Sequence, residues 1–256
     1  MNRARLQKVK IHYNQPIDVT PDKKLLGEIT VPYSQAYSFN KWDGWKTTYR
    51  LYYSSIHWVT ALEKGPDGKP WYRILDELDE TIYFVPASHV RIIPAEEISP
   101  ITPGLPFEAK RIHVNLTTQI LTAYEGDHPV FETKISSGLA GLSNTDISSS
   151  TPVGDFHIQS KYPSKHMGIA NLAASIDDYV LPGVPWTSFF TDLGHAFHGT
   201  YWHDNFGVPM SHGCVNMKPE DAKWIFRWTR PTASLDDLDQ TKLYRIGYGT
   251  LVQIRS

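Results

Sequence analysis

Short runs of alternating apolar and polar residues mark the first part of the chain. Val9, Ile11 and Tyr13 form one such run, and Ile29 with Val31 forms another. A period of two residues places every second side chain on the same face, as in a β-strand with one buried side. We therefore predict strands here.

Turn-forming residues separate further strands before residue 94. Gly65–Pro70 contains two Gly and two Pro and predicts a turn. It precedes Trp71–Asp76 and Ile82–Pro86, which are rich in aromatic and β-branched residues and read as strands. Tyr33–Tyr53 is also rich in aromatic residues and carries no site motif, so we expect a structured insertion there.

A polar segment rich in Pro and Gly follows at Glu96–Pro106. It contains Pro100, Pro103, Gly104 and Pro106. Segments of this composition commonly join domains. We predict a linker at residues 98–106 between one domain of residues 1–97 and a second of residues 107–256.

The alternation is stricter after the linker. Ile112, Val114 and Leu116 begin a predicted meander that continues through Ile120–Tyr124 and Val130–Ser137. Residues 161–185 have no clear period, so we expect a loop or short helix there. Further strands are expected at Phe156–Ser160, Trp186–Phe190 and Leu251–Ile254.

A helix is predicted after Asn216. Pro219 suits its first turn, and Glu220 and Asp221 would face the positive end of the helix dipole. Its apolar positions recur on one side, at Ala222, Ile225 and Phe226.

Two runs containing histidine carry the candidate chemistry. One is His195–His203, and the other is Ser211–Asn216, which holds Cys214, the only cysteine of the chain. A cysteine attacks a carbonyl carbon as thiolate, so it needs a base and groups that hold negative charge. His198 is a candidate base, and His212 would share the face of Cys214 on an extended segment.

Gly213 allows a close backbone approach because it lacks a Cβ, and the backbone N–H groups around it are candidates to receive an oxyanion. Two other interpretations use the same residues. A lone cysteine is commonly a small buried apolar residue. A zinc site is the other, although the sequence has no CxxC pair and no acid accompanies the HxxH spacing. Its possible ligands are His195, His198, His203, His212 and Cys214.

These runs resemble a known family. His198-Gly199-Thr200, then Phe206-Gly207, then Ser211-His-Gly-Cys-Val-Asn216 is similar to the signature of the L,D-transpeptidase catalytic domain, or YkuD domain. Thr151-Pro152-x-Gly154-x-Phe156 matches another motif of that family. The resemblance covers residues 107–255 and implies a mainly β fold, a β-sandwich with one or two short helices.

The resemblance also implies the roles of individual residues. Cys214 would be the nucleophile, His198 the general base, and Gly199 the residue whose backbone carbonyl orients that imidazole. His212 would support the site, and Gly213 would contribute to the oxyanion hole. Contacts with substrate are expected from Ser211, Asn216, Tyr201 and Trp202.

The first domain resembles a second family. Trp71-Tyr72-Arg73-Ile74 with Asp76, followed by Tyr83-Phe84-Val85-Pro86 and Val90-Arg91, is similar to the last strands of bacterial SH3-like domains. This resemblance implies a small β-barrel within residues 1–97.

Composition narrows the possible partners. The net charge is −2 with no basic stripe, so nucleic acid is not an expected partner. No apolar run approaches the length that spans a bilayer, and the charged residues 1–10 precede no apolar segment, so no signal peptide is expected. The family resemblance nevertheless implies a location in the bacterial cell envelope, which would make this chain the mature part of a longer precursor.

The expected function is L,D-transpeptidation between peptidoglycan stem peptides, in cell wall biogenesis, without metal or organic cofactor. An L,D-carboxypeptidase or a hydrolase of cross-links would use the same Cys and His. A non-catalytic wall-binding protein and a cytoplasmic thiol enzyme with another substrate are further alternatives. The oligomeric state is left open by the sequence.

Overall fold

The computed structural model describes residues 9–20, 23–139, 149–168, 180–232 and 249–256. The fold is mainly β, as expected, with several sheets and one α-helix among these residues. The described residues divide into two compact units. One contains residues 9–94 and 164–185, and the other contains residues 95–163 and 186–256. No helix in the described ranges has the length and apolar composition that crossing a membrane requires.

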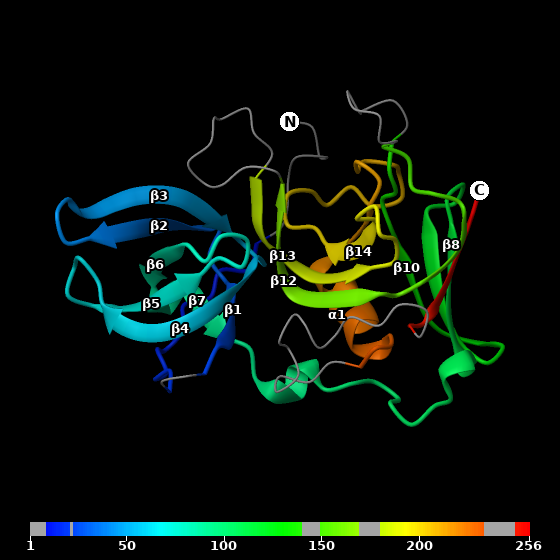
Figure 1. Ribbon diagram of the computed structural model, residues 1–256, viewed down its shortest axis with the longest axis horizontal. Helices are drawn as coiled ribbons and strands as arrows, with labels where there is room; N and C mark the ends of the chain where they lie inside the picture. Colours follow the sequence, from blue (N-terminus) through cyan, green and yellow to red (C-terminus); the bar gives the residue numbers. More distant parts are fainter. Residues whose placement is uncertain (1–8, 21–22, 140–148, 169–179, 233–248) are drawn as a thin grey trace. The chain divides into compact units, whose positions relative to one another are not determined.

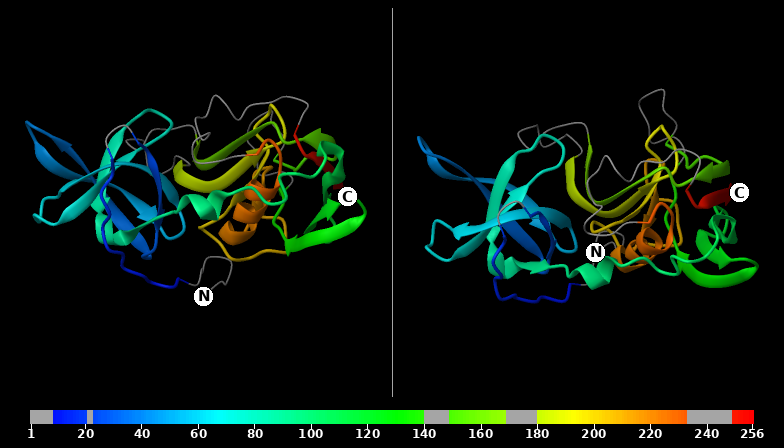
Figure 2. Two further views of the ribbon diagram at one scale, coloured as in Figure 1. Left: turned by 90° about the horizontal axis from the view of Figure 1, so that it is seen from below. Right: turned by 60° about the horizontal axis from the view of Figure 1, so that its bottom comes forward.

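The first unit is built on a seven-stranded sheet with the order β3-β2-β6-β5-β4-β1-β7 (Figures 1 and 2). All neighbouring strands in this sheet are antiparallel. Its strands are β1 (Leu25–Ile29), β2 (Tyr33–Asn40), β3 (Gly44–Tyr52), β4 (Ile56–Lys64), β5 (Pro70–Leu75), β6 (Ile82–Pro86) and β7 (Val90–Ile92). A 3-10 helix, η2 (Ala87–His89), joins β6 to β7.

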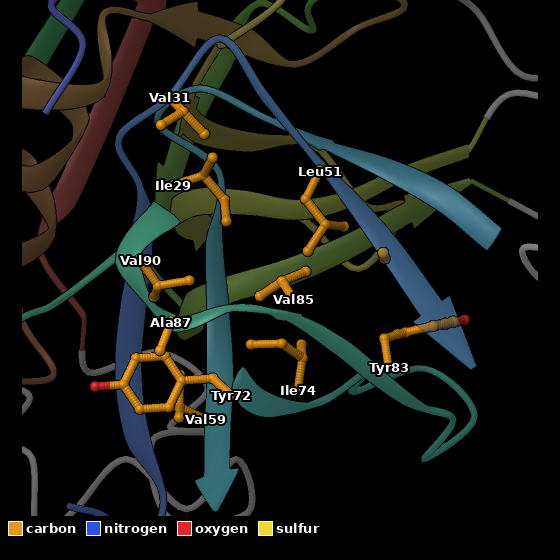
Figure 3. Close-up of a cluster of buried hydrophobic side chains, with 11 residues drawn as sticks. Ile29, Val31, Leu51, Val59, Tyr72, Ile74, Tyr83, Val85, Ala87 and Val90 are labelled. Carbon is orange, nitrogen blue, oxygen red and sulfur yellow. The ribbon is translucent and has the colours of Figure 1, made fainter. Parts of the chain in front are cut away.

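A cluster of buried apolar side chains holds this sheet together (Figure 3). Its members come from strands far apart in the sequence, and most are β-branched or aromatic, which suits a pleated, buried surface. They include Ile29, Leu51, Val59, Tyr72, Ile74, Val85 and Val90. The strands expected at Trp71–Asp76 and Ile82–Pro86 therefore form as predicted, as β5 and β6.

Two expectations for this unit are wrong. Val9, Ile11 and Tyr13 belong to no strand, because their segment makes only scattered backbone hydrogen bonds, such as His12 N–H to Thr30 O. Their side chains are 39%, 55% and 66% exposed. Tyr33–Tyr53 is not an insertion but supplies β2 and β3 of the sheet. Its aromatic rings pack on neighbouring strands, with Tyr37 against Trp71 and Trp45 against Phe84.

Residues 164–168 and 180–185 belong to the same unit although they follow much later in the sequence. Ser164 Oγ donates a hydrogen bond of 2.6 Å to Ile56 O, and Tyr49 Oη donates one of 3.0 Å to Val180 O. His166 Nδ1 lies 2.8 Å from the Asp76 carboxylate, and both side chains are buried. The first unit is thus completed by a segment outside residues 1–97.

The second unit contains a five-stranded sheet with the order β10-β9-β8-β16-β11 (Figure 1). The predicted meander forms its first three strands, and β16 then pairs parallel with β8, at Val252 opposite Ile112. Alternate residues Ile112, Val114, Val252 and Ile254 are fully buried. The strands are β8 (Lys110–Asn115), β9 (Ile120–Glu125), β10 (His128–Lys134), β11 (Gly154–His157) and β16 (Leu251–Arg255).

A four-stranded sheet has the order β12-β13-β14-β15. Its strands are β12 (Ser160–Gly168), β13 (Val180–Phe189), β14 (Ala196–Gly199) and β15 (Val215–Met217). The loop or short helix expected at residues 161–185 is wrong wherever the structure describes it, because β12 and β13 occupy both ends of that range. Val184–Ser188 of β13 is buried at every position, so no alternation marks the strand in the sequence.

The predicted helix is α1 (Pro219–Trp228), which packs against β14 (Figure 1). Pro219 occupies its first turn with Glu220 and Asp221, as expected. Two buried lysine side chains meet its carboxyl end: Lys110 Nζ donates to Trp228 O and Lys161 Nζ to Thr229 O. The last helical carbonyls, which lack partners within the helix, accept these bonds, although burial lowers the pKa of both lysines. Two further 3-10 helices lie among the described residues, η3 (Ala95–Ile98) and η4 (Phe107–Ala109).

Gly183 of β13 gives a first testable prediction. Gly183 has φ of +70°, and a Cβ built on it lies 2.6 Å from Ile56 O and 2.4 Å from His57 Cε1. Gly183→Ala should lower the free energy of unfolding by about 2–5 kcal/mol, because left-handed strain and a backbone clash add. Urea unfolding followed by tryptophan fluorescence measures this loss.

Gly44 provides the matched control. It has the same φ of +70°, and a Cβ there meets nothing within 4 Å. Gly44→Ala should therefore cost only the backbone strain, about 1–2 kcal/mol. Equal losses in the two variants would contradict the close approach of Gly183 to β4.

Candidate active site

The candidate base and nucleophile lie on neighbouring strands. β14 carries His198, and Cys214 directly precedes β15. The two strands are parallel, with Phe197 opposite Val215 and His198 opposite Asn216. Paired residues point their side chains to the same face of a sheet, so His198 and Asn216 share one face.

His198 is held in one tautomer. Its Nδ1 lies 3.1 Å from the backbone carbonyl oxygen of Gly199. A carbonyl only accepts hydrogen bonds, so Nδ1 carries the proton and Nε2 keeps its lone pair. Burial lowers the pKa of His198 to about 4, with the Gly199 carbonyl opposing and His203 adding to this shift. The side chain is 2% exposed, so at neutral pH it is an uncharged acceptor.

Cys214 lies beside the beginning of β14. Its Sγ is 3.6 Å from Gly194 O. The residue is partly exposed, and partial loss of hydration at its sulfur raises the pKa of the thiol to about 11. A backbone hydrogen bond from Ala196 opposes the shift.

The resting pair is therefore neutral thiol and neutral imidazole. With the thiol pKa near 11 and the imidazole pKa near 4, transferring the proton from sulfur to His198 in the resting site is unfavourable. A base in this state removes the thiol proton as the sulfur attacks, which is general-base catalysis.

A second backbone segment fixes the cysteine loop. Ser136 exchanges two hydrogen bonds of 2.9 Å with the backbone of Asn216. Met210 N–H and Ser211 N–H both donate to Ser137 O, and Leu139 N–H donates to Ser211 O. The buried Gln119 binds this segment from behind, through Ser137. The backbone before and after Cys214 is thus held by strand-like pairing.

Two hydroxyl groups complete this support. Thr151 Oγ1 accepts a hydrogen bond from Gly138 N–H and donates one to Gly213 O. Ser211 Oγ accepts from Gly213 N–H and donates to Cys214 O. The Ser211 hydroxyl and the Gly213 N–H therefore pair with each other in this structure.

Gly213 has a conformation and surroundings that suit only glycine. Its φ is +122°, and a Cβ built on it lies 3.0 Å from the His195 ring. The expected close approach is thus made by His195, whose Nδ1 lies 2.8 Å from Thr191 Oγ1. Because Gly213 is not extended, the alternation that would put His212 on the face of Cys214 does not hold across it.

The other predicted site residues differ in their surroundings. His212 is exposed. Trp202 is partly exposed, with its ring centroid 5.8 Å from that of His198. Tyr201 is buried and contacts Trp202 edge to face. Their expected roles in supporting the site and binding substrate remain predictions.

Sequence reasoning missed the pairing of His203 with Asn216. It treated His203 only as a possible zinc ligand, whereas His203 Nε2 lies 3.0 Å from the Asn216 carboxamide. No spacing rule links these residues, because a loop separates β14 from β15. Within the described ranges, no group of three His, Cys, Asp or Glu side chains is arranged to hold a metal ion.

The high thiol pKa gives a prediction for the free protein. Below pH 11 the thiol predominates, and the thiolate fraction rises about tenfold for each pH unit. The rate of Cys214 alkylation by iodoacetamide should therefore keep rising from pH 6 to pH 10 without a plateau. Mass spectrometry of the quenched protein measures this rate.

The unfolded chain is the reference for this experiment. In denaturant the alkylation rate of Cys214, the only cysteine of the chain, should level off above its ordinary pKa of about 8.5–9. A plateau already reached between pH 5 and pH 8 in the folded protein would contradict a neutral resting pair, because it would indicate a thiolate held by imidazolium.

Comparison with known proteins places this site in a family. The sequence model of the L,D-transpeptidase catalytic domain (YkuD) matches residues 109–254, more than half of the chain. No curated protein sequence matches the chain.

Solved structures of L,D-transpeptidases are similar at low identity. A mutant of the Enterococcus faecium enzyme is 22% identical over 58% of this chain, with a TM-score of 0.42, and the match spans half, 50%, of that chain. The enzyme from Mycobacterium smegmatis is 17% identical over 70% of this chain and 75% of its own, with a TM-score of 0.44. L,D-transpeptidase 3 from Mycobacterium tuberculosis is 16% identical over 79% and 92%, with a TM-score of 0.42. By the match to its sequence model, this chain belongs to the L,D-transpeptidase catalytic domain family.

Proposed function

We propose that this chain is an L,D-transpeptidase that cross-links peptidoglycan stem peptides through a Cys214 thioester. One observation carries the proposal. The Gly199 carbonyl leaves His198 Nε2 as an uncharged acceptor, on a strand that pairs with the strand following Cys214. A cysteine that attacks a peptide carbonyl needs a neighbouring base to take the proton of its thiol.

In the first step, Cys214 Sγ attacks the carbonyl carbon of the third residue of a stem tetrapeptide, and His198 Nε2 takes the thiol proton. The bond to the terminal D-alanine breaks, and the imidazolium returns the proton to the departing amine. The products are free D-alanine and an acyl group held on sulfur as a thioester.

In the second step, the amine of a neighbouring stem attacks the thioester carbonyl. His198 accepts the proton of this amine, the bond from carbon to sulfur breaks, and the imidazolium returns the proton to Sγ, which restores the thiol. Neither step needs a metal or a cofactor, since the groups that move protons belong to the chain.

Backbone N–H groups near Cys214 are the proposed oxyanion donors. The Gly213 N–H contributes only if it exchanges its bond to Ser211 Oγ for the substrate oxygen. The fixed backbone on both sides of Cys214 supports this role, because preorganised donors stabilise a developing charge without reorganising. We assign His212 to the rim of the site, and Trp202 and Tyr201 to the substrate cleft.

We also propose a cell-envelope location, because the proposed substrate lies outside the cytoplasmic membrane. We further propose that residues 1–97 contain an SH3-like module. These residues form an antiparallel sheet with one apolar cluster, as an SH3-like module would, but the strand order ends at β3 and β7 rather than closing.

The test is incubation with purified disaccharide-tetrapeptide, with products identified by mass spectrometry. A cross-linked dimer and free D-alanine are expected from the wild-type chain. Cys214→Ala should form neither, because no nucleophile remains, and His198→Ala should lose at least about a hundredfold in acylation rate.

Each other product points to a different function. Tripeptide without dimer would establish an L,D-carboxypeptidase, in which water replaces the acceptor amine. Release of monomers from cross-linked dimer would establish a hydrolase. Wall binding without turnover would overturn the catalytic proposal, and so would an active Cys214→Ala variant.

A further inference from the structure

The pair formed by His203 and Asn216 has a chemical asymmetry. The structure places Asn216 Nδ2 3.0 Å from His203 Nε2. The carboxamide oxygen, Oδ1, is buried and has no hydrogen-bond partner among the described residues. The two atoms, Oδ1 and Nδ2, exchange places by a half-turn about the bond from Cβ to Cγ. His203 therefore decides whether the unpaired atom is an acceptor or a donor.

Counting the donors settles this orientation. Asn205 N–H lies 3.3 Å from His203 Nδ1 and can only donate, so Nδ1 accepts and carries no proton. Burial lowers the pKa of His203, and the opposing charge of Asp204 is the smaller influence, so the ring is neutral at pH 7. Its single proton then sits on Nε2. With the carboxamide as placed, the Nε2–H and Nδ2 donors would face each other. We therefore assign the carboxamide turned by a half-turn, so that Oδ1 accepts from Nε2–H and Nδ2 becomes the unpaired atom.

The backbone on both sides of this pair is fixed. Ser136 Oγ donates to Asn205 O at 3.1 Å, and Asn205 Nδ2 lies 3.0 Å from Met210 Sδ. The Asn205 N–H that sets the tautomer of His203 is therefore held in place. Asn216 is held by its two backbone bonds to Ser136, so its side chain has only its own torsions to adjust.

The unpaired donor lies on the side of the sheet where the proposed chemistry occurs. Asn216 is opposite His198 in the parallel pairing of β14 and β15, so the two side chains share a face. Asn216 is 2% exposed, and a buried donor without a partner is costly unless a ligand supplies an acceptor.

We propose that His203 is a positioning residue that, through Nε2–H, holds the Asn216 carboxamide with its N–H groups presented to an oxygen of the stem peptide. This inference rests on the proposed function for the identity of the ligand. The orientation itself depends only on the hydrogen bonds of the free protein.

The first experiment reads the tautomer directly. Nitrogen NMR of protein labelled with 15N-histidine, assigned by difference with His203→Gln, should show His203 as the neutral Nε2–H tautomer at pH 7. A proton on Nδ1, or a charged ring, would overturn the inference. This reading does not depend on turnover, so it stands even if the tetrapeptide is not a substrate.

The second experiment compares two substitutions in acylation by tetrapeptide. His203→Gln places an amide N–H near the position of Nε2 and should keep kcat/KM within about threefold. His203→Leu removes the donor and should lower kcat/KM about tenfold, a free-energy change of about 1.4 kcal/mol. Asn216→Asp, which lacks the amide donor, should lose at least as much.

The pattern among variants separates positioning from packing. Equal losses in His203→Gln and His203→Leu would overturn the inference, and so would wild-type kcat/KM in His203→Leu. Thermal unfolding of each variant shows whether it remains folded. If the wild-type chain fails to acylate at all, the proposed function fails, and the NMR tautomer alone decides the role of His203.

Discussion

The parallel pairing of β14 with β15 is the constraint on which the site depends. It is a short contact between strands separated by a loop, yet it brings the proposed base, the proposed nucleophile and Asn216 to one edge of a sheet. Three residues of pairing are not enough to hold a loop in place. The segment around Ser136–Leu139 therefore pairs with the other side of the cysteine loop, and Gln119 and Thr151 secure it. The catalytic geometry is a property of this backbone network more than of any single side chain.

The electrostatics of the site follow from the same burial. Loss of hydration disfavours the thiolate form of Cys214 and the imidazolium form of His198. The resting site therefore holds no ion pair, and the proton leaves the sulfur only as the sulfur attacks the substrate. The buried lysines at the carboxyl end of α1 are stabilised by other groups. There Lys110 and Lys161 each meet main-chain carbonyls and lie over an aromatic ring, which offsets part of the cost of a buried cation.

Much of the fold was readable from the sequence where a segment has one buried face. The meander from β8 to β10 and helix α1 formed as predicted because alternation and helical periodicity report that single face directly. The strand expected at Trp186–Phe190 forms the second half of β13, but the first half was missed because Pro182–Pro185 is buried at every position and shows no alternation. Val9–Tyr13 was predicted wrongly because an alternating pattern does not ensure a partner strand. In the site, the signature identified Cys214 and His198 as candidates. The His203 to Asn216 contact was beyond sequence reasoning, since it depends on where a loop folds back.

The division of the chain between its two units also has a consequence for synthesis. The unit that begins the described chain is completed only by residues 164–185, after most of the meander and β11 of the other unit have been made. A ribosome releases the chain from its amino end, and early domains generally fold first. Here the seven-stranded sheet waits for Ser164 to reach Ile56 and for His166 to reach Asp76. The nascent chain must therefore hold a sheet that lacks these two contacts while β8 to β11 of the other unit emerge.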